Sequence, residues 1–194
     1  MRKLALLIFQ SVDGVMQAPS QPDEDVSGGF ELGGWANPCW GDVMEQVTQE
    51  AMAESYDLLL GGYTYDLFAP HFSQAGDDNP VAAKLNQAKK YVATSRAEPL
   101  DWNNSTQLTG DLAQQIAELK QADGPLIQVH GSWQLVQLLL QAKLVDELRV
   151  WTFPVALGSG KRLFEQLNAP VELQLSKTAQ TPSGAVMTFY QTKY

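Results

Sequence analysis

The sequence has one cysteine, two histidines and few basic residues. The single thiol, Cys39, excludes an intrachain disulfide framework and suits a reducing compartment, so we expect a cytoplasmic protein. A metal site needs His, Cys or carboxylate side chains clustered at ligand spacing, and neither His71 nor His130 belongs to such a cluster. The 22 acidic and 13 basic residues give a net charge of −9, which argues against nucleic-acid binding but is compatible with a small anion in a local pocket.

Long apolar runs and several catalytic motifs are also missing. No stretch approaches the roughly 20 apolar residues of a membrane span, so no membrane partner is expected. The run at residues 4–9 is too short for a signal-peptide core, and no A-x-A pattern follows it, so we interpret it as the first strand. No G-x-S-x-G motif makes Ser132 a hydrolase nucleophile, and Gly158-Ser-Gly160 does not extend to G-x-G-x-x-G.

The chain does contain a regular alternation of strand and helix patterns. Its 194 residues and 44% hydrophobic content fit one domain, residues 1–194. The order of the patterns predicts an α/β fold with a mostly parallel central sheet and a C-terminal antiparallel hairpin. The expected strands are 3–9, 56–62, 90–94, 126–129, 147–153, 171–179 and 185–191, and the expected helices are 42–55, 64–68, 80–88, 112–121 (capped by Asp111) and 132–142, with a polar irregular segment at 71–79.

Residues 17–40 show no periodicity and are rich in Gly, Pro, Asp and Trp. Loops of this length are either functional or disordered, and the aromatic residues Phe30, Trp35 and Trp40 argue against disorder. We therefore expect a functional loop. Its tryptophans either stack on a bound heterocycle, plug the core or form a subunit contact.

The most informative stretch is 126–164, which reads as a buried strand, a Gly131-Ser132 turn, an amphipathic helix, a second strand and a glycine loop. The N-terminus of a helix offers free backbone N–H groups and a favourable dipole to an anion, and a glycine at the turn allows close approach. The stretch therefore indicates a phosphate-bearing cofactor at the start of the helix. The alternative is an ordinary strand–helix turn, of which α/β proteins contain many.

Six short motifs follow one another along the chain: SVDG at 11–14, LLLGGYTY at 58–65, YVATSR at 91–96, VHGS at 129–132, LVDEL at 144–148 and PVALGSG at 154–160. Each motif is weak alone, but the ordered set spans nearly the whole chain and resembles the dihydrofolate-reductase-like superfamily. Within that superfamily, the set is most similar to the C-terminal reductase domain of the bifunctional riboflavin-biosynthesis enzyme and its stand-alone relatives.

The resemblance implies a three-layer dihydrofolate-reductase-like fold and a reductase that uses NADPH. It also implies that the dinucleotide lies across the carboxyl ends of the central strands, in accord with the general rule for open α/β sheets. The implied cofactor-binding residues are Gly61, Tyr63 and Thr64 beside the phosphates, Ser95 and Arg96 around the adenosine ribose and its 2′-phosphate, and Gly131, Ser132, Gln134 and Leu135 at the pyrophosphate.

This sequence departs from the family pattern at two positions. Relatives commonly have an arginine directly after the first glycine, where it grips the 2′-phosphate, and this chain has Gly62. Arg96, with Lys89 and Lys90 nearby in sequence, is the expected substitute for that charge. The second departure is Ser132, which stands where folate enzymes have the second glycine of a Gly-Gly pair.

A reductase must also protonate its substrate, and three carboxylates are candidates. Asp42 and Glu45 share one face of the helix after the long loop, and Asp13 follows the first strand. Their alternatives are a solvated helix face and a turn aspartate that satisfies its own backbone. The expected substrate-binding residues are Gly14, Trp35, Gly158 and Lys161. Lys161 with Arg162 suits a substrate phosphate or is a solvated pair at a helix start.

The resemblance leaves two readings of function open. The first is NADPH-dependent reduction of a pyrimidine- or pteridine-like heterocycle, as by 5-amino-6-(5-phosphoribosylamino)uracil reductase. The second is a non-catalytic protein that binds a dinucleotide or heterocycle on the same fold, since fold does not determine function. The resemblance also implies a homodimer.

Overall fold

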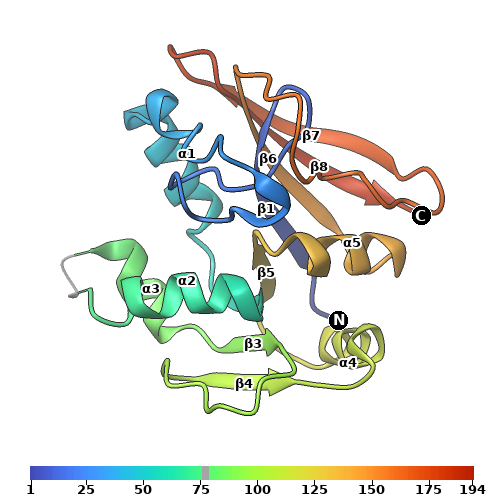
Figure 1. Cartoon of the computed structure of the whole chain (residues 1–194). Coiled ribbons are helices and arrows are strands. Elements are labelled where there is room, and N and C mark those ends of the chain that lie inside the picture. Colours follow the sequence, from blue (N-terminus) through green and yellow to red (C-terminus); the bar gives the residue numbers. More distant parts are fainter. Residues whose placement is uncertain (76–78) are drawn as a thin grey trace.

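The computed structural model describes residues 1–75 and 79–194, and an eight-stranded sheet forms its centre (Figure 1). The strands lie in the order β4-β3-β2-β5-β1-β6-β8-β7. The first six are parallel, whereas β8 is antiparallel to β6 and β7 is antiparallel to β8. This confirms the expected α/β architecture with a C-terminal hairpin. The strands are β1 (Leu4–Ser11), β2 (Tyr56–Gly61), β3 (Lys90–Ala93), β4 (Ser105–Leu108), β5 (Leu126–His130), β6 (Glu147–Phe153), β7 (Glu172–Gln180) and β8 (Val186–Lys193).

Helices cover both faces of the sheet and make three layers (Figure 1). Alternate residues of β1 point to opposite faces. Leu6 packs in one buried cluster with Leu139 of α5, and Leu7 packs in another with Met44 of α1. The N-terminus of α4 is capped as expected, because Asp111 Oδ1 accepts the Gln114 N–H at 3.0 Å. The helices are α1 (Asp42–Ala51), α2 (Gly62–Phe72), α3 (Pro80–Gln87), α4 (Leu112–Gln121) and α5 (Trp133–Gln141).

The direction in which each connection moves along the sheet explains this layering. The connections from β1 to β2 and from β2 to β3 move toward the β4 edge, and their helices α1, α2 and α3 contribute to the clusters on one face. The connections from β4 to β5 and from β5 to β6 move the other way, and α4 and α5 pack on the opposite face. Right-handed crossovers require this separation.

Three expectations about local structure are wrong. Strand β4 was not expected, because its sequence STQL is mostly polar and exposed and carries no apolar signal. Helix α1 ends at Ala51 instead of 55, where Lys84 Nζ donates to the carbonyls of Met52 and Ala53. Helix α2 is longer than expected and includes part of the segment 71–79, since Phe72 stacks on Trp102 at 6.4 Å. Residues 76–78 of that segment lie outside the described residues.

The long loop after β1 contains two short 3-10 helices, η1 (Ser27–Gly29) and η2 (Asn37–Cys39). Its aromatic residues Phe30 and Trp35 are buried beside Phe153 of β6, in the same cluster as Met44 of α1. The loop is therefore anchored to the sheet by apolar contacts. Within residues 1–75 and 79–194, no helix is long and apolar enough to cross a membrane.

Candidate functional site

A cleft of about 600 Å³ opens at the carboxyl ends of the central strands. Its walls include Phe9 of β1, Gly61 of β2 and His130 of β5, which are neighbouring strands in the sheet. The chain leaves β1 and β2 toward one face and leaves β5 toward the other, so the cleft lies at a topological switch point. Open α/β sheets bind their ligands at such points.

The first wall of the cleft is built around the turn between β5 and α5. Gly131 has φ +56° and Ser132 has φ +63°, two consecutive left-handed residues joined by a trans peptide. The Ser132 hydroxyl accepts the Gly61 N–H at 2.8 Å and donates to Thr64 Oγ1 at 2.7 Å. These two bonds join the turn after β5 to the turn after β2. The hydroxyl group therefore fixes the spacing of two strand–helix junctions, which offsets the strain of a left-handed serine.

The N-termini of α2 and α5 both border this wall. Neither helix is capped by a side chain: the N-cap residue of α2 is Gly61, and the Ser132 side chain before α5 is used by Gly61 and Thr64. The first bond inside α5 runs from the Val136 N–H to the Ser132 carbonyl, which leaves the N–H groups of residues 133–135 to a ligand. Two uncapped helix N-termini with a glycine turn between them fit a pyrophosphate, by hydrogen bonds and by dipole.

A buried polar chain lies beneath the floor of the cleft. Glu147 Oε1 accepts from Arg149 Nε at 2.6 Å, Arg149 Nη1 donates to Gln128 Oε1 at 3.2 Å, and Gln128 Nε2 lies 2.7 Å from His130 Nε2. Because the Gln128 oxygen accepts from Arg149, its amide nitrogen donates to His130 Nε2, and the proton of the neutral ring is on Nδ1. Burial, with the charge of Arg149, lowers the pKa of His130 to about 4. His130 is therefore neutral at pH 7.

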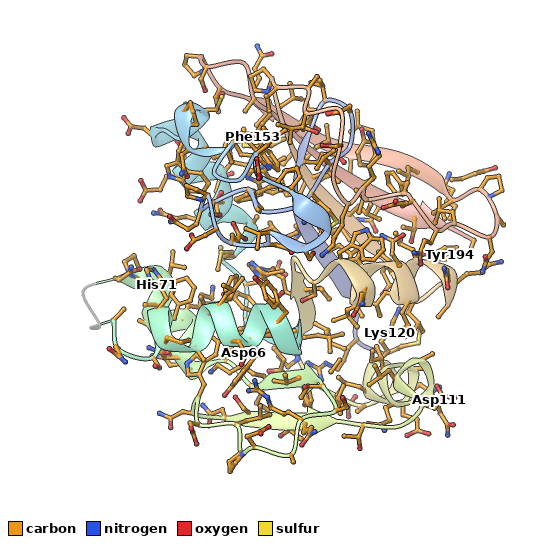
Figure 2. The ribbon with its side chains drawn as sticks, in the orientation of Figure 1. Asp66, His71, Asp111, Lys120, Phe153 and Tyr194 are labelled. Atoms are coloured by element: carbon orange, nitrogen blue, oxygen red, sulfur yellow. The ribbon has the colours of Figure 1, made fainter. Side chains whose placement is uncertain are left out.

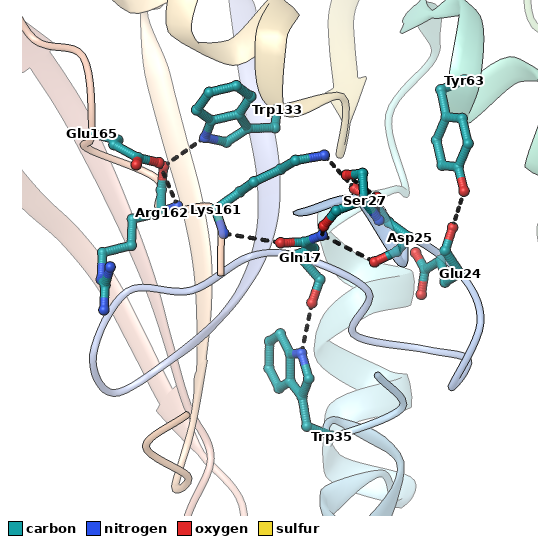
Figure 3. Close-up of polar contacts among 10 residues, drawn as sticks. All are labelled: Gln17, Glu24, Asp25, Ser27, Trp35, Tyr63, Trp133, Lys161, Arg162 and Glu165. Carbon is teal, nitrogen blue, oxygen red and sulfur yellow. Dashed lines mark hydrogen bonds and ion pairs between the residues drawn. The ribbon is translucent and has the colours of Figure 1, made fainter. Parts of the chain in front are cut away.

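The second wall is the loop after β1, and Gln17 is its central residue (Figure 3). Gln17 Nε2 donates to the carbonyls of Asp25 and Ser27, both at 3.0 Å, and Gln17 Oε1 accepts the Lys161 N–H at 3.1 Å. The Gln17 carbonyl accepts from Trp35 Nε1 at 2.8 Å. One buried amide thus joins the loop to itself and to the segment after β6.

An ion pair also stabilises this second wall, the loop after β1. Lys161 Nζ lies 2.6 Å from Asp25 Oδ2, and the Lys161 ammonium also lies 5.9 Å from the centre of the Trp133 ring at the start of α5 (Figure 3). Burial raises the pKa of Asp25, but hydrogen bonds from Lys161 and Ser27 outweigh it, so the net shift is downward. Asp25 is therefore ionised and its charge is matched by that of Lys161.

Glu24 brings a second carboxyl group to the cleft. Its Oε2 accepts the N–H groups of Ser20 at 2.7 Å and Gln21 at 3.1 Å, and its backbone carbonyl accepts from the Tyr63 hydroxyl of α2. Burial raises the pKa of Glu24 above its usual range, against the opposing effect of the two backbone bonds. In the described residues, no Lys or Arg lies within salt-bridge distance of this carboxylate.

Most of the residues expected to bind the cofactor lie together at the first wall. Two do not line the cleft: Ser95 is exposed, and the Arg96 guanidinium pairs with Asp66 of α2 at 2.5 Å. The Asp66 side chain is labelled in Figure 2. Lys90, expected to help with phosphate charge, is fully buried and donates to the carbonyls of Asn86, Ala88 and Asn103, so that expectation is wrong. The residues that do line the cleft are Gly61, Tyr63, Thr64, Gly131, Ser132, Gln134 and Leu135.

The three carboxylates considered for proton transfer do not line the cleft. Asp13 accepts from the Ser11 hydroxyl at 2.6 Å and from the N–H groups of Leu157 at 3.0 Å and Gly158 at 2.8 Å. Those bonds, led by that of Ser11, hold its pKa far below its usual range, so Asp13 fastens the turn after β1 to the segment after β6. Asp42 and Glu45 lie in the exposed first turn of α1.

Of the four residues expected to bind substrate, one lines the cleft. That residue is Lys161, already paired with Asp25. Trp35 is buried and packs edge-on against Phe153 at 5.5 Å, in the core rather than at the cleft. Gly14 and Gly158 are loop glycines with positive φ and lie outside the cleft lining.

Sequence reasoning missed several residues of the site. Gln17, Glu24 and Asp25 lie in an aperiodic loop, where no pattern separates a cleft residue from a solvated one. Leu67 and Phe68 of α2 belong to a helix whose sequence suggests only a buried face. His130 was visible as the residue before the glycine turn, and that position is the one signal that could have placed it.

Comparisons with known proteins agree with this geometry. The model of the RibD C-terminal domain family matches residues 2–187. Two uncharacterized Bacillus subtilis (strain 168) proteins are similar: YwjB, 31% identical over 179 residues and 92% of each chain, and YyaP, 26% identical over 136 residues, 69% of this chain and 72% of YyaP.

Solved structures share the fold at low identity. A putative riboflavin biosynthesis protein from Shewanella sp. PV-4 has a TM-score of 0.66, with 20% identity and all of both chains covered. A pyrimidine reductase-like protein from Corynebacterium diphtheriae has a TM-score of 0.67, with 11% identity over 100% of this chain and 92% of that one. Dihydrofolate reductase from Enterococcus faecalis, complexed with NADP(H) and RAB-propyl, has a TM-score of 0.62, with 13% identity over 99% and 97%. The chain therefore belongs to the RibD C-terminal domain family and has the dihydrofolate-reductase-like fold.

Proposed function

We propose that this protein is an NADPH-dependent reductase of a pyrimidine- or pteridine-like heterocycle. The observation that carries the proposal is the pair of uncapped helix N-termini, α2 and α5, held at one glycine turn by the Ser132 hydroxyl. That geometry suits a dinucleotide pyrophosphate at the switch point of the sheet. Membership of a family of reductase domains supports the same conclusion.

The shape of the remaining cleft suits a flat ring beside the dinucleotide. Phe9 of β1 and Phe68 of α2 both line it, and Leu7, Leu67 and Leu138 add apolar surface. NADPH, when bound, supplies the hydride, and the protein supplies position and a dry environment. The neutral His130 ring presents its Nδ1 proton from the floor of the cleft, a donor suited to a carbonyl or amide oxygen of a bound ring.

We further propose that Glu24 delivers the proton that accompanies the hydride. It is a carboxyl group that lines the cleft, and burial raises its pKa, the direction that suits a proton donor near neutral pH. Its backbone bonds from Ser20 and Gln21 hold Oε2 in place and leave Oε1 to exchange a proton with substrate. Asp13, Asp42 and Glu45 remain predictions for this role, and their positions outside the cleft favour Glu24 over them.

Titration with NADPH and NADH, followed by tryptophan fluorescence, tests the cofactor. Trp133 lines the cleft and reports binding there. We expect NADPH to bind, and Arg96→Ala to weaken NADPH more than NADH if Arg96 leaves Asp66 to reach the 2′-phosphate. Binding of neither dinucleotide by folded protein would sink the proposal.

Oxidation of NADPH in the presence of candidate heterocycles then separates an enzyme from a binding protein. Turnover that Glu24→Gln reduces at least tenfold in kcat, with NADPH affinity unchanged, supports the reductase with Glu24 as acid. Dinucleotide binding without turnover across pyrimidines and pteridines would favour the non-catalytic alternative. We also propose that the chain acts as one domain and as a homodimer, which sedimentation would test.

A further inference from the structure

The charges in the cleft restrict the substrate class within the proposed function. Of the residues that line the cleft in the described chain, three have acidic or basic side chains other than histidine: Glu24, Asp25 and Lys161. His130 is neutral there, because burial lowers its pKa to about 4. The cleft therefore contains one side-chain cation and two carboxyl groups.

That cation is already neutralised. The Lys161 ammonium lies 2.6 Å from Asp25 Oδ2, and the Lys161 side chain is 31% exposed against 19% for Asp25. The partner carboxylate is itself held in place, because Asp25 Oδ1 accepts from the Ser27 N–H at 3.1 Å and from the Ser27 hydroxyl at 2.6 Å. A phosphate that approached Lys161 would have to displace a carboxylate that is fixed by two further hydrogen bonds.

Other cations near the loop are also engaged. Arg162 donates from Nε to the Asp13 carbonyl at 3.1 Å and from Nη2 to the Gly158 carbonyl at 3.2 Å, and it does not line the cleft. Arg96 pairs with Asp66. The uncapped N–H groups of α2 and α5 can bind an anion, but under the proposed function the dinucleotide pyrophosphate takes them.

We propose that the substrate carries no phosphate, and that Asp25 determines this specificity by holding Lys161. The inference rests on the proposed function, since it assigns the helix N-termini to the cofactor. A phosphate-free heterocycle, neutral or positively charged, meets no repulsion from Asp25 or Glu24. A phosphorylated one brings about two negative charges into a cleft without a free counter-charge. A phosphoribosylaminouracil is therefore disfavoured as the substrate.

A matched pair of probes tests the proposal: 5-amino-6-(ribosylamino)uracil and its 5′-phosphate, each titrated into protein saturated with NADPH. We expect the phosphate-free probe to bind at least tenfold more tightly. Asp25→Asn frees the ammonium and should improve the affinity of the phosphorylated probe about tenfold. Asp25→Asn combined with Lys161→Gln removes both charges of the pair and should leave that affinity within about twofold of wild type. The control is Asp23→Asn, which makes the same charge change at an exposed position of the same loop.

Each result either supports or contradicts the proposal that the substrate carries no phosphate. Equal affinities, tighter binding of the phosphorylated probe, binding of neither probe, or loss of affinity for the phosphorylated probe in the double variant would overturn the proposal. The comparison of the two probes on wild-type protein keeps the test decisive even if Asp25→Asn disturbs the loop. Failure of the proposed function shows separately, as absence of NADPH binding before any probe is added. Preference for the phosphorylated probe in protein that binds and oxidises NADPH would overturn the inference alone.

Discussion

The two walls of the cleft are built in different ways. The wall at α2 and α5 is made by short connections that follow buried strands directly, and one hydroxyl, that of Ser132, joins them. The wall after β1 is a long loop held by the Gln17 amide and the Asp25–Lys161 pair. The wall at α2 and α5 takes its shape from the backbone geometry at the strand ends. The wall after β1 depends on side-chain contacts between residues that are distant in sequence. Substitutions should therefore affect the two walls differently.

We expect the largest effect on NADPH affinity from an added methyl group at the wall formed by α2 and α5. Gly131→Ala places a Cβ at a residue with φ +56°, a conformation that costs an L-residue about 1–2 kcal/mol, and brings the methyl group to 3.8 Å from Thr64 Oγ1 at the start of α2. We expect the NADPH dissociation constant to rise at least 100-fold. Gly41→Ala is the matched control, because Gly41 has extended backbone and open space around its Cβ position. Equal effects of the two changes would contradict a cofactor role for the turn.

A smaller effect is expected at the wall held by side chains. Gln17→Leu removes three hydrogen bonds and leaves buried partners unpaired, so we expect the free energy of unfolding to fall by about 2 kcal/mol. Hydrogen exchange should quicken in residues 17–36 and stay unchanged at the starts of α2 and α5. Gln21→Leu, at an exposed site of the same loop, should leave both measurements unchanged. Faster exchange at α5 would show that the walls are not independent.

The floor between the walls should respond to pH. The unfolded chain protonates His130 near pH 6.5, whereas the folded protein does so near 4, because of burial and Arg149. Stability is therefore complete above about pH 6.5 and falls as pH drops toward 4, by about 1–3 kcal/mol for this group. Urea unfolding of wild type and His130→Gln across this range measures the difference. A wild-type curve parallel to that of the variant would refute the assignment of a neutral His130.

We expect the smallest effect on stability and on NADPH affinity at Tyr63, where the two walls contact each other. The Tyr63 side chain is 57% exposed and its hydroxyl donates to the Glu24 carbonyl. Tyr63→Phe removes that bond at an exposed site, so we expect stability to change by less than about 1 kcal/mol. Affinity for NADPH should change by less than threefold. A loss of tenfold or more would mean that the hydroxyl holds the loop over the cofactor.

The same contrast explains how much the sequence could predict. The buried strands and the Gly131-Ser132 turn could be predicted from the sequence, because apolar runs and glycines depend on the local backbone conformation. Of the nine residues that the resemblance implies for the cofactor, seven line the cleft, and Ser95 and Arg96 do not. Lys90 was misjudged because its cage of carbonyls forms only when α3 and the segment before β4 meet.

The loop wall was beyond sequence reasoning for a physical reason. Gln17 and Asp25 are 8 residues apart, but the pair that neutralises Lys161 spans 136 residues. No local periodicity encodes such a contact, so Lys161 looked like a free cation. The sequence left Trp35 between stacking on a heterocycle, a plug in the core and a subunit contact, and the packing of the loop against Phe153 shows it in the core.

Strand β1 is synthesised well before both of the strands that flank it in the sheet. Strand β1 lies between β5 and β6, and its pairs with β5 join Leu4 to Ile127 and Leu7 to His130. A nascent chain must therefore keep an apolar segment unpaired until more than a hundred further residues have been made. Pairing over such separations slows folding and exposes strand edges. During synthesis, residues 4–11 are accordingly the segment that we expect a chaperone to cover.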